Sequence, residues 1–163
     1  MLKHVSGNIL TPNLEDRGVI VCHQVNCMGV MGAGLALQVR TKHPEVFGLY
    51  RDKCRQIAAG IGGLGDVQFC SVLADAGYIV ANIFGQDGYG RDKQYTDYAA
   101  LKKAFQNIAM AFPMYIIRIP YLMGCGLAGG DWNTVYGIVE ETLVTAGVDV
   151  EIWHNPEVGK GVR

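Results

Sequence analysis

The chain has 163 residues, half of them hydrophobic, and a formal net charge of -1. This length and composition fit one globular domain with a sizeable core, which we assign to residues 1–163. The near-neutral charge and the absence of a basic run argue against a broad nucleic-acid-binding surface, and no apolar run is long enough to span a membrane.

The first half of the chain contains signals for three strands and two helices. Turn-forming residues or helix stops separate the apolar segments, and Gly60 is the stop for the second helix. The predicted elements are a buried strand over residues 18–25, helices over 34–43 and 45–60, and strands over 65–74 and 77–85.

The second half continues the alternation. Thr96 is the expected N-cap of the next helix, and Asp131 of the one after it. The predicted elements are a helix over residues 96–112, a strand over 114–120, a helix over 131–147 and a strand over 148–155, followed by a loosely ordered tail at 156–163. Such alternation predicts an α/β protein whose sheet is covered on both faces.

Cysteine and histidine usage indicates a reduced protein without a metal. The five cysteines include no CxxC pair, and the four histidines show no ligand spacing. The N-terminus lacks the apolar stretch of a signal peptide. We therefore expect a cytoplasmic protein that needs no cofactor.

Two glycine-rich turns follow predicted strands and are expected to border one pocket, because ligands of open α/β sheets bind beyond the carboxyl ends of the strands. Successive backbone N–H groups in such turns bind phosphate without a basic side chain. A glycine-rich turn is also often only a tight turn. The first turn comprises Gly32, Ala33, Gly34 and Leu35, and the second comprises Gly124, Cys125, Gly126, Leu127 and Ala128.

Neither turn has a common nucleotide-binding signature. The glycines of "GVMGAG" are spaced GxxGxG rather than GxGxxG, and no GK[ST] sequence occurs. A dinucleotide-binding fold and a P-loop are therefore not predicted.

The order of several motifs resembles that of a macrodomain. These are "GNIL" (7–10), "HQVNCMGVMGAGLA" (23–36), "ANIFGQ" (81–86), "YTDYAALKKA" (95–104) and "IPYLMGCGLAGGDW" (119–132). The resemblance covers nearly the whole chain. The sequence is most similar to the branch that contains the ADP-ribose-1''-phosphate phosphatases and the terminal ADP-ribose–glutamate hydrolases. It implies a three-layer α/β/α fold with a mixed central sheet and a cleft for ADP-ribose.

The resemblance also implies ligand contacts outside the two turns. Asn8 stands where the family has an Asp that receives the adenine amino group, with the backbone of Ile9 beside it. Asn26 matches the asparagine that contacts the distal ribose. Trp153 falls where an aromatic side chain often lies against the adenosine. Ordinary structural roles, such as a turn asparagine, a strand-end cap or a core tryptophan, are the alternatives.

The catalytic residues are less clear, because the glutamate-hydrolase branch has a Lys in the region where Gly85 and Gln86 stand and an Asp where Ala128 stands. His23 has a suitable ordinary pKa for proton transfer, and a buried core histidine is the alternative. Asp87 and Asp92, in the loop before the helix at 96–112, are the other candidates.

The leading functional hypothesis is a hydrolase that removes the 1''-phosphate from ADP-ribose-1''-phosphate. One alternative is removal of ADP-ribose from a modified protein or nucleic acid, as in the macrodomain antitoxins with a similar "VNC.GVMG.G.A" stretch. Another is a binding module that recognises ADP-ribose without catalysis. The expected partner is therefore ADP-ribose or its 1''-phosphate, free or linked to a macromolecule.

Overall fold

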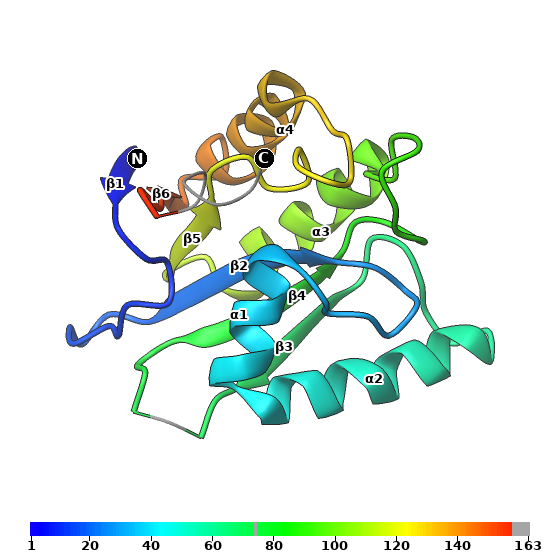
Figure 1. Cartoon of the computed structure of the whole chain (residues 1–163). Coiled ribbons are helices and arrows are strands. Elements are labelled where there is room, and N and C mark those ends of the chain that lie inside the picture. Colours follow the sequence, from blue (N-terminus) through cyan, green and yellow to red (C-terminus); the bar gives the residue numbers. More distant parts are fainter. Residues whose placement is uncertain (74, 158–163) are drawn as a thin grey trace.

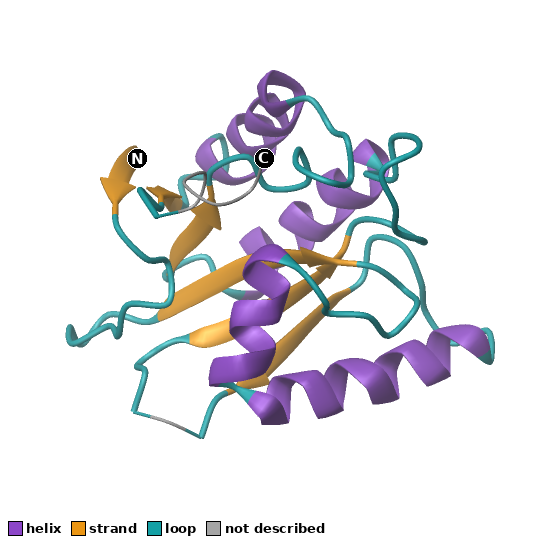
Figure 2. Cartoon of the chain, viewed as in Figure 1, coloured by secondary structure: helices purple, strands orange, loops and turns teal. Residues whose placement is uncertain are grey.

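A computed structural model describes residues 1–73 and 75–157, so Ala74 and residues 158–163 of the predicted tail lie outside the described part. The strands and helices alternate along most of the chain (Figures 1 and 2). The strands are β1 (Leu2–Ser6), β2 (Val19–Val25), β3 (Val67–Ser71), β4 (Ile79–Phe84), β5 (Ile116–Pro120) and β6 (Asp149–His154). The helices are α1 (Gly34–Lys42), α2 (Pro44–Ala58), α3 (Tyr98–Ala111) and α4 (Trp132–Val139), which continues as a π-helical stretch over Glu140–Val144.

The six strands form one mixed sheet in the order β1-β6-β5-β2-β4-β3. β3 pairs with β4 in the antiparallel sense, and every other pair is parallel. The parallel pairs bring the carboxyl ends of β2, β4, β5 and β6 to the same edge of the sheet. The predicted mixed α/β sheet is confirmed.

Helices cover both faces of the sheet, with α1 and α2 on one side and α3 and α4 on the other (Figure 1). The apolar stripe of α3 packs on one face, where Leu101, Phe105 and Ile108 are fully buried against Ile20 and Ile117. Alternate residues of the same strands, such as Val21 and Val80, face α1 and α2. This period-two alternation, with apolar residues on both faces, makes the central strands almost continuously apolar in sequence.

Two features of the fold differ from the sequence prediction. The first strand, β1, was missed, because "LKHVS" is short and half-exposed and has only one sheet neighbour, β6. The cap of α3 was placed one residue early: Asp97, not Thr96, accepts a hydrogen bond from the Ala100 N–H. Asp131 caps α4 as expected by accepting from the Thr134 N–H at 2.9 Å.

No described helix combines the length and apolar character needed to cross a membrane.

Candidate functional site

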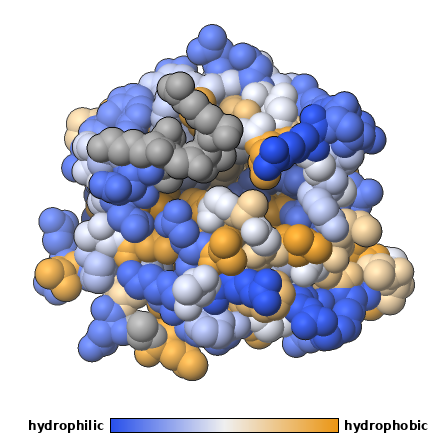
Figure 3. Space-filling view, viewed as in Figure 1, coloured by the Kyte–Doolittle hydropathy of each residue, from blue (hydrophilic) through white to orange (hydrophobic). Residues whose placement is uncertain are grey.

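A cavity of about 750 Å³ opens where the parallel strands end, and both glycine-rich turns line it. This volume lies within the usual range for small-molecule sites. In the face of the molecule that Figure 3 shows, apolar residues gather near the middle. The two turns therefore border one pocket, as their positions after β2 and β5 predicted.

The first turn leads directly into the N-terminus of α1. Ala33 is the N-cap residue and offers no side-chain hydrogen bond to the helix. The N–H groups of Gly34, Leu35 and Ala36 belong to the first helical turn, where no intrahelical acceptor exists. All three residues line the cavity. The helix start is thus free to bind an anion through its backbone.

The second turn presents three consecutive donors. Within the described part of the chain, the N–H groups of Gly126, Leu127 and Ala128 donate to no protein acceptor, and all three residues line the cavity. Gly124 has φ +75°, and a Cβ there would lie 2.8 Å from the Gln24 Oε1 atom. Glycine is therefore required at 124 for both backbone conformation and space. The arrangement can hold phosphate oxygens between two sets of N–H groups.

A chain of side-chain hydrogen bonds fixes the second turn to the rest of the cavity floor. The Gln24 Nε2 group donates to Gln86 Oε1 at 2.8 Å and to Thr96 Oγ1 at 3.0 Å. The Thr96 hydroxyl in turn donates to the Gly124 carbonyl at 2.6 Å. Thr96, expected to cap α3, instead anchors the turn. Gln24 and Gln86 line the cavity and were not among the predicted site residues.

Asn26 lies at the end of β2 and organises the loop before α1. Its Nδ2 group donates to the Val30 carbonyl at 2.8 Å, and its Oδ1 atom accepts from the Met28 N–H at 2.9 Å. The Tyr50 hydroxyl from α2 lies 2.7 Å from the same Oδ1 atom and accepts from the Val30 N–H at 3.1 Å. Asn26 also lines the cavity. It therefore shapes the loop in addition to any contact with a ribose.

Tyr50 offers a test of this loop from outside the cavity. We expect Tyr50→Phe to weaken ADP-ribose binding about tenfold, because a lost hydroxyl leaves partly buried groups of the loop unpaired, at a cost of about 1–3 kcal/mol. Calorimetry of the variant measures the effect. Leu49→Ala, at an exposed position of α2, is the control and is expected to bind normally. Unchanged affinity in Tyr50→Phe would show that the loop keeps its shape without this hydroxyl.

His23 borders the cavity but is only 2% exposed. Its Nε2 atom lies 2.5 Å from Asn82 Oδ1 on β4, and its Nδ1 atom has no partner among the described residues. Burial lowers the pKa of His23 to about 4, although the hydrogen bond to Asn82 opposes the shift. His23 is therefore neutral at pH 7, and this environment does not favour it as a proton carrier there.

The two acidic candidates lie outside the cavity lining. Asp87 is exposed, and its backbone carbonyl accepts from the Cys27 N–H. Asp92 is exposed and accepts a hydrogen bond from the Tyr95 hydroxyl, which lowers the pKa of its carboxyl. No carboxylate side chain lines the described part of the cavity, and its one cation is Arg91.

The remaining predicted contacts divide into two groups. Ile9 and Trp153 line the cavity, as do all the predicted residues of the two turns except Cys125. The Asn8 Oδ1 atom accepts from the Leu10 N–H within its own turn, and neither Asn8 nor Cys125 is in the lining. Burial raises the pKa of Cys125 to about 11, so its thiol is not a nucleophile at neutral pH.

Several lining residues carried no recognisable sequence signal. They come from strand ends and loops whose proximity depends on the fold. Besides Gln24, Gln86 and Arg91, they include Tyr89, Tyr121, Leu122 and Asn155. Leu122 has φ +63°, which is uncommon for a non-glycine residue and fits a turn held in place by its surroundings.

The metal and redox chemistry of the described residues is simple. They contain no group of three or more His, Cys, Asp or Glu side chains able to hold a metal ion. All five cysteines are unpaired.

No family model matches the chain. It is 37% identical over 62 residues to a DNA ADP-ribosyl glycohydrolase of Mycobacterium tuberculosis, covering 38% of this chain and 16% of that protein. It is 29% identical over 101 residues to an ADP-ribose 1''-phosphate phosphatase of Candida glabrata, covering 60% of this chain and 54% of that protein. The matches thus span less than two thirds of these relatives.

The fold comparison covers more of the chain. A macrodomain protein from Streptomyces coelicolor superposes with a TM-score of 0.77 and 28% identity, covering 94% of this chain and 99% of that structure. The mixed sheet of this chain, the two glycine-rich turns that border its cavity and this structural likeness show that the chain has a macrodomain fold.

Proposed function

We propose that this protein is a hydrolase acting on ADP-ribose derivatives, with ADP-ribose-1''-phosphate as its first substrate. The observation that carries the proposal is the pair of N–H clusters, at Gly34–Ala36 and Gly126–Ala128, facing one cavity. Two such clusters suit a diphosphate. No carboxylate side chain among the described residues lines the cavity to repel an anionic ligand, and Arg91 adds a positive charge to the lining. The phosphatase relative supports the choice of substrate.

Binding by the whole cavity gives a direct expectation. ADP-ribose should bind at least about tenfold more tightly than AMP, because AMP lacks the distal ribose and one phosphate and forgoes their charge-assisted hydrogen bonds. NAD should also bind weakly, since nicotinamide occupies the anomeric position. Calorimetry with the three ligands measures the ranking. Equal affinities for AMP and ADP-ribose would contradict this assignment of the cavity.

Phosphate release from ADP-ribose-1''-phosphate tests the reaction itself. The proposed chemistry places one water in line with phosphorus while the two turns hold the diphosphate. Asp87 and Asp92 are the proposed proton carriers, and the proposal requires that the loop at 86–92 brings a carboxylate into the cavity when substrate binds. His23 is the third candidate, and it requires that bound substrate raises its low pKa. The rate of phosphate release from Asp87→Asn and from Asp92→Asn shows which aspartate carries the proton, because only the loss of that carboxylate should slow the reaction. Asp52→Asn, at an exposed position of α2, is the matched control and should keep the wild-type rate.

Two alternative functions are each favoured by a specific observation. A non-catalytic ADP-ribose-binding module is favoured by the neutral, buried His23 and by a cavity whose described lining contains no carboxylate. Removal of ADP-ribose from a macromolecule is favoured by the match to the mycobacterial glycohydrolase. Assays with ADP-ribosylated DNA and protein distinguish these from the phosphatase.

We further propose that residues 1–163 act as one domain in the cytoplasm, on free ligand or on an ADP-ribosylated macromolecule.

A further inference from the structure

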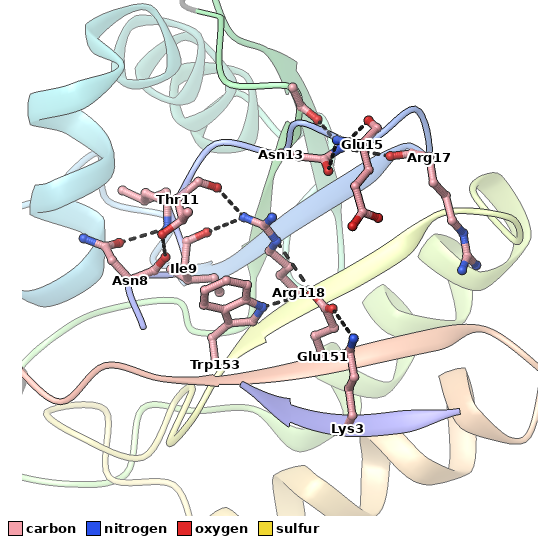
Figure 4. A network of polar contacts seen from close by, with 12 residues as sticks. Lys3, Asn8, Ile9, Thr11, Asn13, Glu15, Arg17, Arg118, Glu151 and Trp153 are labelled. Carbon is pink, nitrogen blue, oxygen red and sulfur yellow. Dashed lines mark hydrogen bonds and ion pairs between the residues drawn. The ribbon is translucent and has the colours of Figure 1, made fainter. Parts of the chain in front are cut away.

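A buried arginine lies behind the Trp153 end of the cavity. Arg118, in the middle of β5, is only 6% exposed. Its Nη1 group donates to the carbonyl oxygens of Ile9 at 3.0 Å and Thr11 at 2.6 Å (Figure 4). Ile9 lines the cavity, so Arg118 holds this wall from behind through two backbone hydrogen bonds.

The same guanidinium supports the second wall, the ring of Trp153. The Arg118 Cζ atom lies 4.6 Å from the centre of the indole. Glu151, the neighbour of Arg118 across the β5–β6 pair, accepts from the Trp153 Nε1 group at 3.2 Å. Lys3 on β1 lies 3.3 Å from the other carboxylate oxygen of Glu151. The ring is thus fixed by a cation on one face and by a carboxylate at its N–H.

Stability alone does not account for a buried cation here. Glu151 lies 3.7 Å from the Arg118 Nε atom, close enough for an ion pair but too far for a hydrogen bond, and Nε has no hydrogen-bond partner among the described residues. Buried ion pairs rarely stabilise a protein more than well-packed apolar side chains of similar volume, since each charge loses its hydration. The geometry instead gives Arg118 three simultaneous contacts that only a planar, multidentate cation makes.

We infer that Arg118 is a positioning residue that sets the base-binding end of the cavity. It connects the turn at residues 8–11 to the ring of Trp153, and so fixes the two walls against which the purine of an ADP-ribose derivative binds. The inference rests on the proposed function. Walls fixed before binding lose less conformational entropy when the base enters, so the arginine contributes to affinity without touching the ligand.

Arg118→Lys tests this role, because lysine keeps the charge but loses the planar fork. We expect the Kd for ADP-ribose to rise about tenfold, the effect of one lost hydrogen bond at a wall. Ribose 5-phosphate, which has no base, should bind with the same Kd to both proteins. In the phosphatase assay KM should rise, and kcat should stay within about twofold of the wild-type value. This is the pattern for a lost contact that substrate and transition state share. Arg17→Lys, whose ion pair with Asp149 is exposed, is the matched control.

A second readout follows the ring itself. In a Trp132→Phe background, Trp153 is the one remaining tryptophan, and Arg118→Lys should shift its emission while the melting temperature reports any loss of folded protein. Glu151→Gln retains an oxygen acceptor for the indole N–H and should change the Kd less than Arg118→Lys does.

Three outcomes count against the inference. An unchanged Kd for ADP-ribose in a folded Arg118→Lys variant overturns it while leaving the proposed function intact. Equal losses for ADP-ribose and ribose 5-phosphate overturn it as well, because the effect is then not at the base. A wild-type protein that does not bind ADP-ribose overturns the proposed function, and this inference with it.

Discussion

Replacing Gly126 with valine should lower the affinity for ADP-ribose at least about a hundredfold while the free energy of unfolding stays nearly unchanged. A Cβ at Gly126 would meet no atom within 4 Å, so the folded protein has room for the side chain. That room is the cavity itself, beside three consecutive N–H groups that have no acceptor among the residues that the structure describes. Losing two hydrogen bonds to a charged diphosphate costs about 3–6 kcal/mol, which corresponds to the stated loss of affinity.

The matched control is Gly48→Val on the exposed face of α2, where a Cβ also meets nothing within 4 Å. It should bind ADP-ribose as the wild type does. Gly124→Val is a useful contrast, because its positive φ and the nearby Gln24 oxygen predict a loss of stability together with binding. Calorimetry and urea unfolding separate the two effects. Normal binding by Gly126→Val would show that the diphosphate lies elsewhere.

The sequence contained enough to locate the cavity, because glycine-rich turns after apolar strands are local signals. It did not contain the pairing of the strands. His23 and Gln24 are adjacent in sequence, yet alternation sends His23 toward Asn82 and Gln24 toward Thr96 on the opposite face. Which of the two would reach the polar floor depends on the register of β2 with β4, which no local pattern specifies.

The roles of other site residues could not be predicted from the sequence, because they depend on contacts between distant segments of the chain. Arg118 sits inside the apolar run "MYIIRIP", where a single charge reads as an edge or exposed position. Its partners are backbone carbonyls more than a hundred residues away. Thr96 and Asp97 are both good N-cap residues, and only the position of Gly124 decides that the threonine anchors the turn. Long-range contacts, rather than propensity, selected these roles.

The stability of the protein should fall as the pH is lowered from 6.5 toward 4, and His23 should account for up to about 3 kcal/mol of that fall. Its pKa is about 4 in the folded protein, against an ordinary value of 6.5 when unfolded. Between these values the unfolded chain binds a proton that the folded chain does not, so acid favours unfolding. The stabilisation is fully present above pH 6.5.

Urea unfolding at several pH values, on the wild type and on His23→Gln, measures this contribution. Glutamine does not titrate, and its amide can donate to Asn82 Oδ1, so the variant should show a flatter dependence over this window. Carboxylates that titrate in the same range affect both proteins alike and cancel in the difference.

The wild type and His23→Gln also test the role of His23 in catalysis. A histidine with a pKa near 4 gives no limb near pH 6.5 in the phosphatase pH–rate profile. A limb near pH 6.5 that disappears in His23→Gln would instead show that substrate binding raises the pKa of His23 and that this histidine carries the proton.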